Sequence, residues 1–370
     1  MTRFLPRALV ALTMLTATGA SAADDGPLKL NDIQVLGSHN SFKRRIPAPV
    51  MALIRQHAPT TAETLDYYHV PLTDQLDRGV RQLEIDVFAD PAGGRYAHPM
   101  GERAAKHAGL STGFDRAAMT APGFKVFHVP DVDYLSHCPT LVGCLTQIDR
   151  WSRAHPRHLP LMITINAADR PMDKPGITDP LALTAPLLDA LDAEIRSVLA
   201  PERMIVPDDV RGGRSTLREA VLAGGWPTLD AARGKIFFVF DVPDDVSTRY
   251  RAGHPSLTGR AMFGFFADTE AEAATIIVQD PLVDGERIRN WVKAGYIVRT
   301  RSDADTTEAR TGSHAKAEAA AASGAQAIST DYYPGAPDPL TLRYTVTLPG
   351  GVTARCNPVR VTRACRLDEK

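Results

Sequence analysis

Short β-branched and aromatic runs alternate with helical patterns along most of the chain. Apolar residues recur at helical spacing over 182–199 and 311–323. Nine runs have the composition of strands: 33–38, 83–88, 125–129, 161–166, 235–241, 262–266, 275–279, 296–301 and 327–331. Alternating strands and helices are typical of a parallel sheet covered by helices. We predict an α/β fold, a TIM-like barrel that uses eight of the nine runs.

The pattern also predicts how the chain is divided. The runs 262–266 and 275–279 are the candidates for the strand that lies outside the barrel. Polar and proline-rich residues over 169–180 and 243–258 indicate long loops. With no internal repeat or linker, we expect one barrel domain over 23–349 and a C-terminal appendage over 350–370.

The first 22 residues have the pattern of an export signal. Arg3 and Arg7 precede an apolar run over 8–15, and Ala20 and Ala22 give a small-residue cleavage pattern. The apolar run is shorter than the roughly 20 residues that cross a bilayer. We predict a signal peptide over 1–22 and a secreted or periplasmic protein.

Four cysteines fall into two pairs that are close in sequence, Cys138 with Cys144 and Cys356 with Cys365. Export permits disulfides, and four cysteines allow three connectivities. The two local pairings are preferred because each closes a short loop. Neither pair has the spacing of a zinc site.

The 42 basic and 43 acidic side chains almost cancel. No overall field would therefore attract the protein to nucleic acid. We expect a monomer without a nucleic-acid partner, and peripheral contact with a membrane stays open.

Polar residues gather where the predicted strands end. Glu84 and Asp86 alternate with aliphatic residues, so both face one side of their strand, which is the interior of a barrel. Two inward carboxylates need a compensating charge. Calcium fits them, with the amide oxygens of Asn40 and Asn166 as further hard ligands. The alternative is a salt-bridge cluster with Arg81, Arg299 or Arg301.

Five segments carry further motifs: IQVLGSHNS at 33–41, PLTDQLDRGVRQLEID at 71–86, HVPD at 128–131, WPTLD at 226–230 and VRTR at 298–301. Together these segments resemble the bacterial calcium-dependent branch of the phosphatidylinositol-specific phospholipase C superfamily. The similarity covers nearly all of the chain after residue 22.

The resemblance implies roles for individual residues. His39 and His128 would be the catalytic histidines, and Asn40, Glu84 and Asp86 would bind calcium. Animal members have a glutamate where this chain has Asn166, so the fourth calcium ligand is a departure from the family pattern. The other nine histidines lack such companion residues.

The implied reaction is cleavage of phosphatidylinositol, or another phosphodiester lipid, to diacylglycerol and a cyclic inositol phosphate. It needs a base on the attacking hydroxyl, an acid on the leaving oxygen, and positive charge at the phosphoryl group. We assign protonation of the leaving group to His128. The base on the attacking hydroxyl is His39 or Glu84. Arg301 and Asp331 are candidate contacts of the sugar head group, with a salt bridge as the equal alternative.

Two other functions compete with this one. A glycerophosphodiester phosphodiesterase or sphingomyelinase D shares the chemistry, but the former has His-Arg-Gly after the first strand, where this chain has His39, Asn40 and Ser41. A catalytically inactive calcium- or lipid-binding protein would keep only the fold. Loss of a catalytic residue would indicate it, yet both histidines and both carboxylates are present.

Overall fold

The computed structural model describes residues 27–369. The predicted signal peptide therefore lies outside the described residues. Within residues 27–369, no helix has the length and apolar character needed to cross a membrane.

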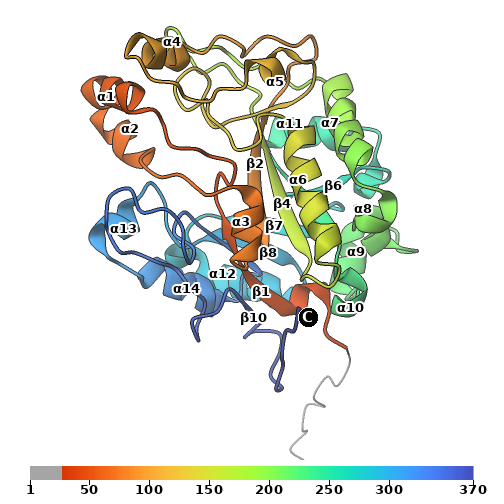
Figure 1. Ribbon diagram of the computed structural model, residues 1–370. Helices are drawn as coiled ribbons and strands as arrows, with labels where there is room; N and C mark the ends of the chain where they lie inside the picture. Colours follow the sequence, from red (N-terminus) through yellow and green to blue (C-terminus); the bar gives the residue numbers. More distant parts are fainter. Residues whose placement is uncertain (1–26, 370) are drawn as a thin grey trace, which may run out of the picture.

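Eight parallel strands form a nearly closed barrel, which confirms the predicted TIM-like fold (Figure 1). Their spatial order is β6-β5-β4-β2-β1-β9-β8-β7. Between β6 and β7 the barrel is joined by the single bridge Phe265–Thr275. The strands are β1 (Ile33–Ser38), β2 (Gln82–Phe88), β4 (Leu161–Ala167), β5 (Ile236–Asp241), β6 (Met262–Gly264), β7 (Thr275–Val278), β8 (Ile297–Arg301) and β9 (Ala327–Thr330).

The strand outside the barrel is not one of the two that the sequence suggested. Both runs between residues 262 and 279 belong to the barrel, as β6 and β7. The outside strand is β3 (Lys125–Val126), which pairs antiparallel with Val87 and Phe88 of β2. It ends early because His128 and Val129 turn back and donate their backbone N–H groups to Asp133. A short apolar run carries no signal that separates these two kinds of strand.

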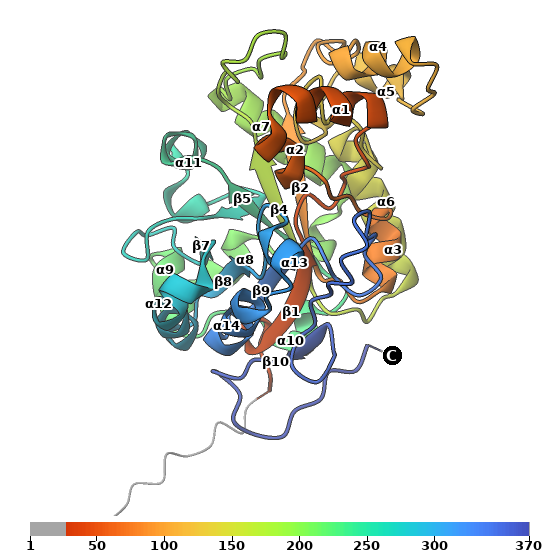
Figure 2. The ribbon, with the colours of Figure 1, turned by 90° about the vertical axis from the view of Figure 1, so that its left-hand side faces the viewer.

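Helices cover the outside of the barrel and extend its loops (Figures 1 and 2). Helix α7 contains the predicted helical pattern, with Leu188, Leu191 and Ile195 buried on one face. The α-helices are α1 (Ala48–His57), α2 (Pro59–Thr64), α3 (Leu72–Asp77), α4 (Met100–His107), α5 (Arg116–Thr120), α6 (Leu141–Ala154), α7 (Ala185–Val198), α8 (Pro207–Arg211), α9 (Leu217–Leu222), α10 (Leu229–Ala232), α11 (Asp244–Arg251), α12 (Pro281–Ala294), α13 (Thr307–Thr311) and α14 (Ala315–Ser323).

Two local predictions need correction. The helical pattern over 311–323 is divided at Gly312, whose positive φ of 68° separates α13 from α14. The predicted loop over 243–258 contains α11. Its acidic first turn and basic last turn match the helix dipole, although Pro243 and Gly253 on either side resemble a loop.

The barrel interior is polar in its middle layers. Gln82 on β2 accepts from Ser329 on β9 at 2.5 Å and donates to Thr164 on β4 at 3.3 Å. Gly37 on β1 leaves room for this glutamine, because a Cβ there would lie 1.9 Å from Gln82 Oε1. The interior therefore carries a continuous hydrogen-bond network, and polar side chains on β2, β8 and β9 have partners across the barrel.

The C-terminal segment lies at the end of the barrel where the parallel strands begin (Figure 2). Strand β10 (Ala354–Cys356) pairs antiparallel with β1. Both predicted disulfides are present, Cys138–Cys144 and Cys356–Cys365. The second one ties residues 356–365 together below the strand.

Candidate active site

The carboxyl ends of the barrel strands bring most of the predicted site residues to one mouth. His39 follows β1, Glu84 and Asp86 lie on β2, and Asn166 lies near the end of β4. Asp86 and Asn166 are direct partners in the β2–β4 register. Parallel strands build their sites at this end, so the predicted ligand set is brought to one region.

His39 is held by an acidic and a phenolic group. Its Nδ1 lies 3.1 Å from Asp331 Oδ1 and 3.2 Å from the Tyr67 hydroxyl, while Nε2 lies 3.7 Å from Glu84 Oε1. Burial and the nearby Arg301 lower the pKa of His39. The side chain remains 18% exposed. A neutral imidazole with Nδ1–H directed at Asp331 leaves Nε2 free to accept a proton.

Asp331 and Arg301, the candidate sugar contacts, pair with each other. Arg301 Nη2 donates to Asp331 Oδ2 at 3.2 Å, and both residues are buried. Burial alone would raise the pKa of Asp331, but His39, His69 and Arg301 hold it well below its usual range. Asp331 is therefore placed to orient His39. The backbone oxygen of His39 also accepts from His69 Nε2 at 2.7 Å, a contact that the sequence did not predict.

Glu84 forms the salt bridge that the sequence offered as an alternative. Its Oε2 accepts from Arg299 Nη2 at 2.5 Å, and Arg299 also donates to Gln279 at 2.8 Å and to Ser329 at 2.9 Å. Arg299 is fully buried. One carboxylate of the β2 pair is thus neutralised by the protein, while its Oε1 still faces His39.

Asp86 has no such cation. Of the residues that the structure describes, none forms an ion pair with Asp86 within 4.0 Å. Burial, together with Glu84 and Asp241, raises the pKa of Asp86 well above its ordinary value. This part of the mouth therefore gathers more carboxyl groups than its own cations compensate.

The Asn40 amide lies against Asp86 and can face it in two ways. With its NH₂ toward Asp86, it donates at 3.0 and 3.2 Å, and its oxygen accepts from Tyr67 at 2.8 Å. With the amide reversed, Nδ2 donates to the Tyr67 hydroxyl at the same distance. The amide oxygen then faces the Asp86 carboxylate, and a cation between the two would stabilise that orientation.

Asp241 is a site residue that the sequence interpretation missed. It ends β5 and is the register partner of Asn166, so Asp86, Asn166 and Asp241 form one row across three strands. Burial raises the pKa of Asp241 to about 6. The signal was available, because Asp241 is an acidic residue at the carboxyl end of a predicted barrel strand.

These residues suit a hard divalent cation. Over residues 27–369, no three histidine, cysteine, aspartate or glutamate side chains converge closely enough to hold a metal by themselves. Amide oxygens would therefore have to complete the set. The nearby amides are those of Asn40, which lies against Asp86, and of the exposed Asn166, the register partner of Asp86 and Asp241. Carboxylate and amide oxygens without thiolate or imidazole favour calcium over zinc.

His128 comes from the segment after β3 and not from a barrel strand. Its Nδ1 lies 2.7 Å from Asp133 Oδ2, and its side chain is 24% exposed. The same Asp133 oxygen lies 3.1 Å from Lys43 Nζ. Lys43 lies over the Tyr67 ring at 4.8 Å, so these contacts join the surroundings of His128 to those of His39.

Residues 28–358 match the family described as phosphoinositide phospholipase C, Ca²⁺-dependent. This match spans most of the chain. The chain belongs to the calcium-dependent phosphoinositide phospholipase C family. The members of this family are enzymes that cleave phosphodiesters, and their cofactor is calcium. No curated protein sequence matches the chain.

Solved structures share the fold of this phospholipase C family member. A calcium-dependent phosphoinositol-specific phospholipase C from Pseudomonas sp. aligns with a TM-score of 0.53 at 14% identity, over 89% of this chain and 96% of that one. The Ca²⁺-dependent enzyme from Streptomyces antibioticus aligns with a TM-score of 0.53 at 19% identity, over 83% and 96%. At such low identity the likeness concerns the fold alone.

Proposed function

We propose that the protein cleaves phosphatidylinositol to diacylglycerol and a cyclic inositol phosphate. The observation that carries the proposal is the mouth of the barrel, where the His39–Asp331 pair lies beside Glu84 and the uncompensated Asp86. Family membership supports the substrate class. The bound calcium would supply positive charge to the phosphoryl oxygens.

His39 takes the proton of the attacking inositol hydroxyl on Nε2. Glu84 already carries Arg299 on one oxygen, so we assign it to orientation of the hydroxyl and of His39. Asp331 holds His39 Nδ1–H and stabilises the imidazolium that forms. The new bond joins the hydroxyl oxygen to phosphorus, and the bond from phosphorus to the glycerol oxygen breaks.

His128 supplies the proton to the departing glycerol oxygen. Its Nδ1 is bound to Asp133, which leaves Nε2–H as the donor. Diacylglycerol leaves as the neutral alcohol, and the phosphate stays on inositol as a five-membered cyclic diester. We assign the calcium ligands to Asn40, Glu84, Asp86 and Asn166, and we add Asp241.

We further propose a secreted or periplasmic monomer that contacts membranes peripherally. The two disulfides support an oxidising compartment. Exposed Leu53 on α1 and Met100 on α4 support contact with lipid, because both helices lie on the same side of the molecule in Figure 1. An apolar surface there would bring the barrel mouth to a lipid substrate.

Turnover of phosphatidylinositol in detergent micelles tests the proposal. We expect inositol phosphate release with calcium and none with a chelator. His39→Ala and His128→Ala should each lower kcat about 10²- to 10⁴-fold, the usual size of general acid–base catalysis. His155→Ala, at the exposed residue that follows α6, is the control that should keep full activity. Calcium binding without turnover would favour the inactive lipid-binding protein instead.

A further inference from the structure

We propose that Lys43 and Asp133 form a buried positioning pair that holds His128 ready to protonate the leaving group. The proposal rests on the proposed function, in which His128 is the acid. Lys43 and Asp133 act through His128 and do not touch the substrate.

A single carboxylate oxygen of Asp133 contacts both His128 and Lys43. Asp133 Oδ2 lies 2.7 Å from His128 Nδ1 and 3.1 Å from Lys43 Nζ. The side chains of Lys43 and Asp133 are both fully buried, whereas His128 is partly exposed. The line of contacts therefore runs from the interior to the surface and ends at the histidine.

The backbone fixes the distance between His128 and its partner. Asp133 O accepts from the N–H groups of His128 and Val129, both at 3.2 Å, and Asp133 N donates back to Val129 O at 3.0 Å. Within this turn Asp131 has a positive φ of 68°, and its carboxylate accepts from the N–H groups of Met100 and Thr178. Such a turn holds the imidazole and carboxylate together before substrate arrives.

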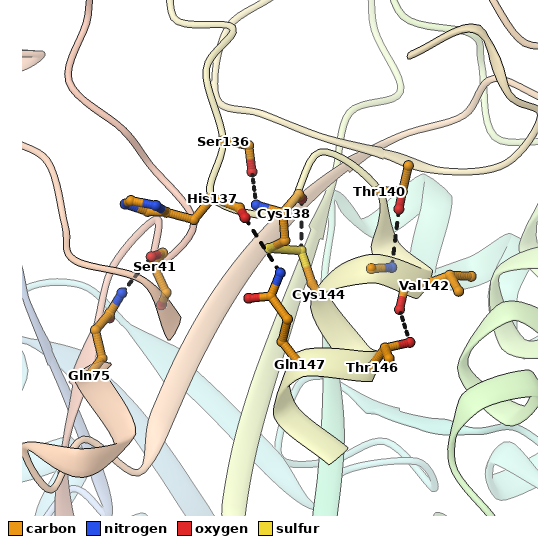
Figure 3. The surroundings of a disulfide bond; sticks show 11 residues. Ser41, Gln75, Ser136, His137, Cys138, Thr140, Val142, Cys144, Thr146 and Gln147 are labelled. Atoms are coloured by element: carbon orange, nitrogen blue, oxygen red, sulfur yellow. Dashed lines mark hydrogen bonds between the residues drawn. A yellow bond between two sulfur atoms is a disulfide. The ribbon is translucent and has the colours of Figure 1, made fainter. Parts of the chain in front are cut away.

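Lys43 is held just as firmly from the other side. Its N–H donates to Asn40 O at 2.9 Å, its O accepts from His69 N at 3.0 Å, and it forms a backbone bridge with Ser136. The Cys138–Cys144 disulfide anchors the segment that follows Ser136 (Figure 3). Lys43 thereby ties the loop that carries His39 and Asn40 to the loop that carries His128.

Stability alone does not explain a buried lysine here. A buried ion pair usually adds little net stability, because both ions lose their hydration. Besides Asp133, Lys43 Nζ has one hydrogen-bond acceptor, Leu65 O at 3.1 Å, and Asp133 Oδ1 has no hydrogen-bond partner within residues 27–369. Such an incompletely satisfied pair is poorly suited to a purely structural role.

Its effect on His128 is specific. Burial would raise the pKa of Asp133, but Lys43 and His128 together lower it, so the carboxylate stays ionised. An ionised Asp133 keeps the proton on His128 Nδ1 and directs Nε2 outward. After Nε2–H passes to the glycerol oxygen, His128 is neutral and still bound to Asp133. Lys43 balances the carboxylate charge throughout, and solvent returns the proton to Nε2.

The test compares two substrates with different leaving groups. Phosphatidylinositol releases an alkoxide that needs a proton, whereas an inositol 4-nitrophenyl phosphodiester releases a phenolate that leaves without one. Lys43→Met and Asp133→Asn should lower kcat on phosphatidylinositol by about 100-fold and kcat on the nitrophenyl substrate by less than about fivefold. KM should change little for either substrate.

Lys125→Met is the matched control, because Lys125 is equally buried and lies 3.9 Å from Asp90. It should leave the ratio of the two kcat values as in the unmodified protein. Equal losses on both substrates in Asp133→Asn, whose shape is unchanged, would overturn the positioning role. If the unmodified protein hydrolyses neither substrate, the proposed function itself is wrong.

Discussion

The two ends of the barrel both bury charged side chains, but they treat them differently. At the amino end, Arg81 donates to Glu369 at 2.7 and 2.5 Å and to the carbonyls of Leu76 and Val80. At the mouth, Asp86 forms no ion pair with any residue in 27–369, and His39 remains partly exposed. Buried charge with complete partners serves stability, whereas incompletely compensated charge next to solvent leaves room for a cation and a substrate.

The largest expected effect comes from the mouth. Asp86→Asn removes the carboxylate that lacks a cation, so calcium-dependent turnover should fall on the order of 1,000-fold. The melting temperature should stay the same or rise, because Glu84 and Asp241 lose a neighbour of like charge. Turnover assays and thermal denaturation of the same sample check both effects. A large loss of stability would place Asp86 among the structural charges.

The reverse result is expected at the amino end. Arg81→Met should lower the free energy of unfolding by about 3 kcal/mol, because it leaves Glu369 and two backbone carbonyls without their donor. Glu369 is partly exposed, which limits the loss. Urea denaturation measures it. Activity of the folded fraction should be unchanged, and a loss of kcat would remove the contrast between the two ends.

His158, near the amino end of the barrel, should make the free energy of unfolding depend on pH. Burial lowers the pKa of His158 from 6.5 to about 4. The unfolded chain takes up this proton below pH 6.5 and the folded chain does not, so stability falls as pH decreases toward 4. Between pH 7 and 4.5 this histidine should account for about 2 kcal/mol. In His158→Gln, the urea midpoint should depend less on pH, and an unchanged dependence would refute the assignment.

The smallest expected effect concerns Asp241. Asp241→Asn should weaken calcium binding on the order of tenfold, because the site loses one of its charged oxygen ligands. With a pKa near 6, Asp241 in the unmodified protein should bind protons in competition with calcium as pH falls from 7 to 5. Calorimetric titration at both pH values checks this. If Asp241→Asn binds calcium as tightly as the unmodified protein, Asp241 is not a ligand.

Some of the site could be predicted because strand geometry determines it. Alternation on one strand places Glu84 and Asp86 on the same face, and the register then aligns Asp86 with Asn166. The sequence could equally have indicated Asp241. All eight barrel strands match runs that local composition predicts, and both disulfide pairings join cysteines that are near in sequence. Local patterns did not show which of the nine runs lies outside the barrel.

Other parts depend on contacts that no periodicity describes. Tyr67, Asp133 and Lys43 come from connecting segments, and they meet only after the loops following β1 and β3 have packed together. The sequence offered Arg299 as one of three arginines for the carboxylate pair, but only the folded barrel selects it for Glu84, 215 positions away. For the same reason β3 was taken for a barrel strand, because its position depends on the turn that Asp133 closes.

The most direct measurement is ³¹P NMR of phosphatidylinositol micelles during a calcium titration of the unmodified protein. A cyclic inositol phosphodiester resonance should appear as calcium is added and should stop growing when a chelator is added. Calcium binding without any new phosphodiester resonance would contradict the proposal that the barrel mouth is a phospholipase C active site.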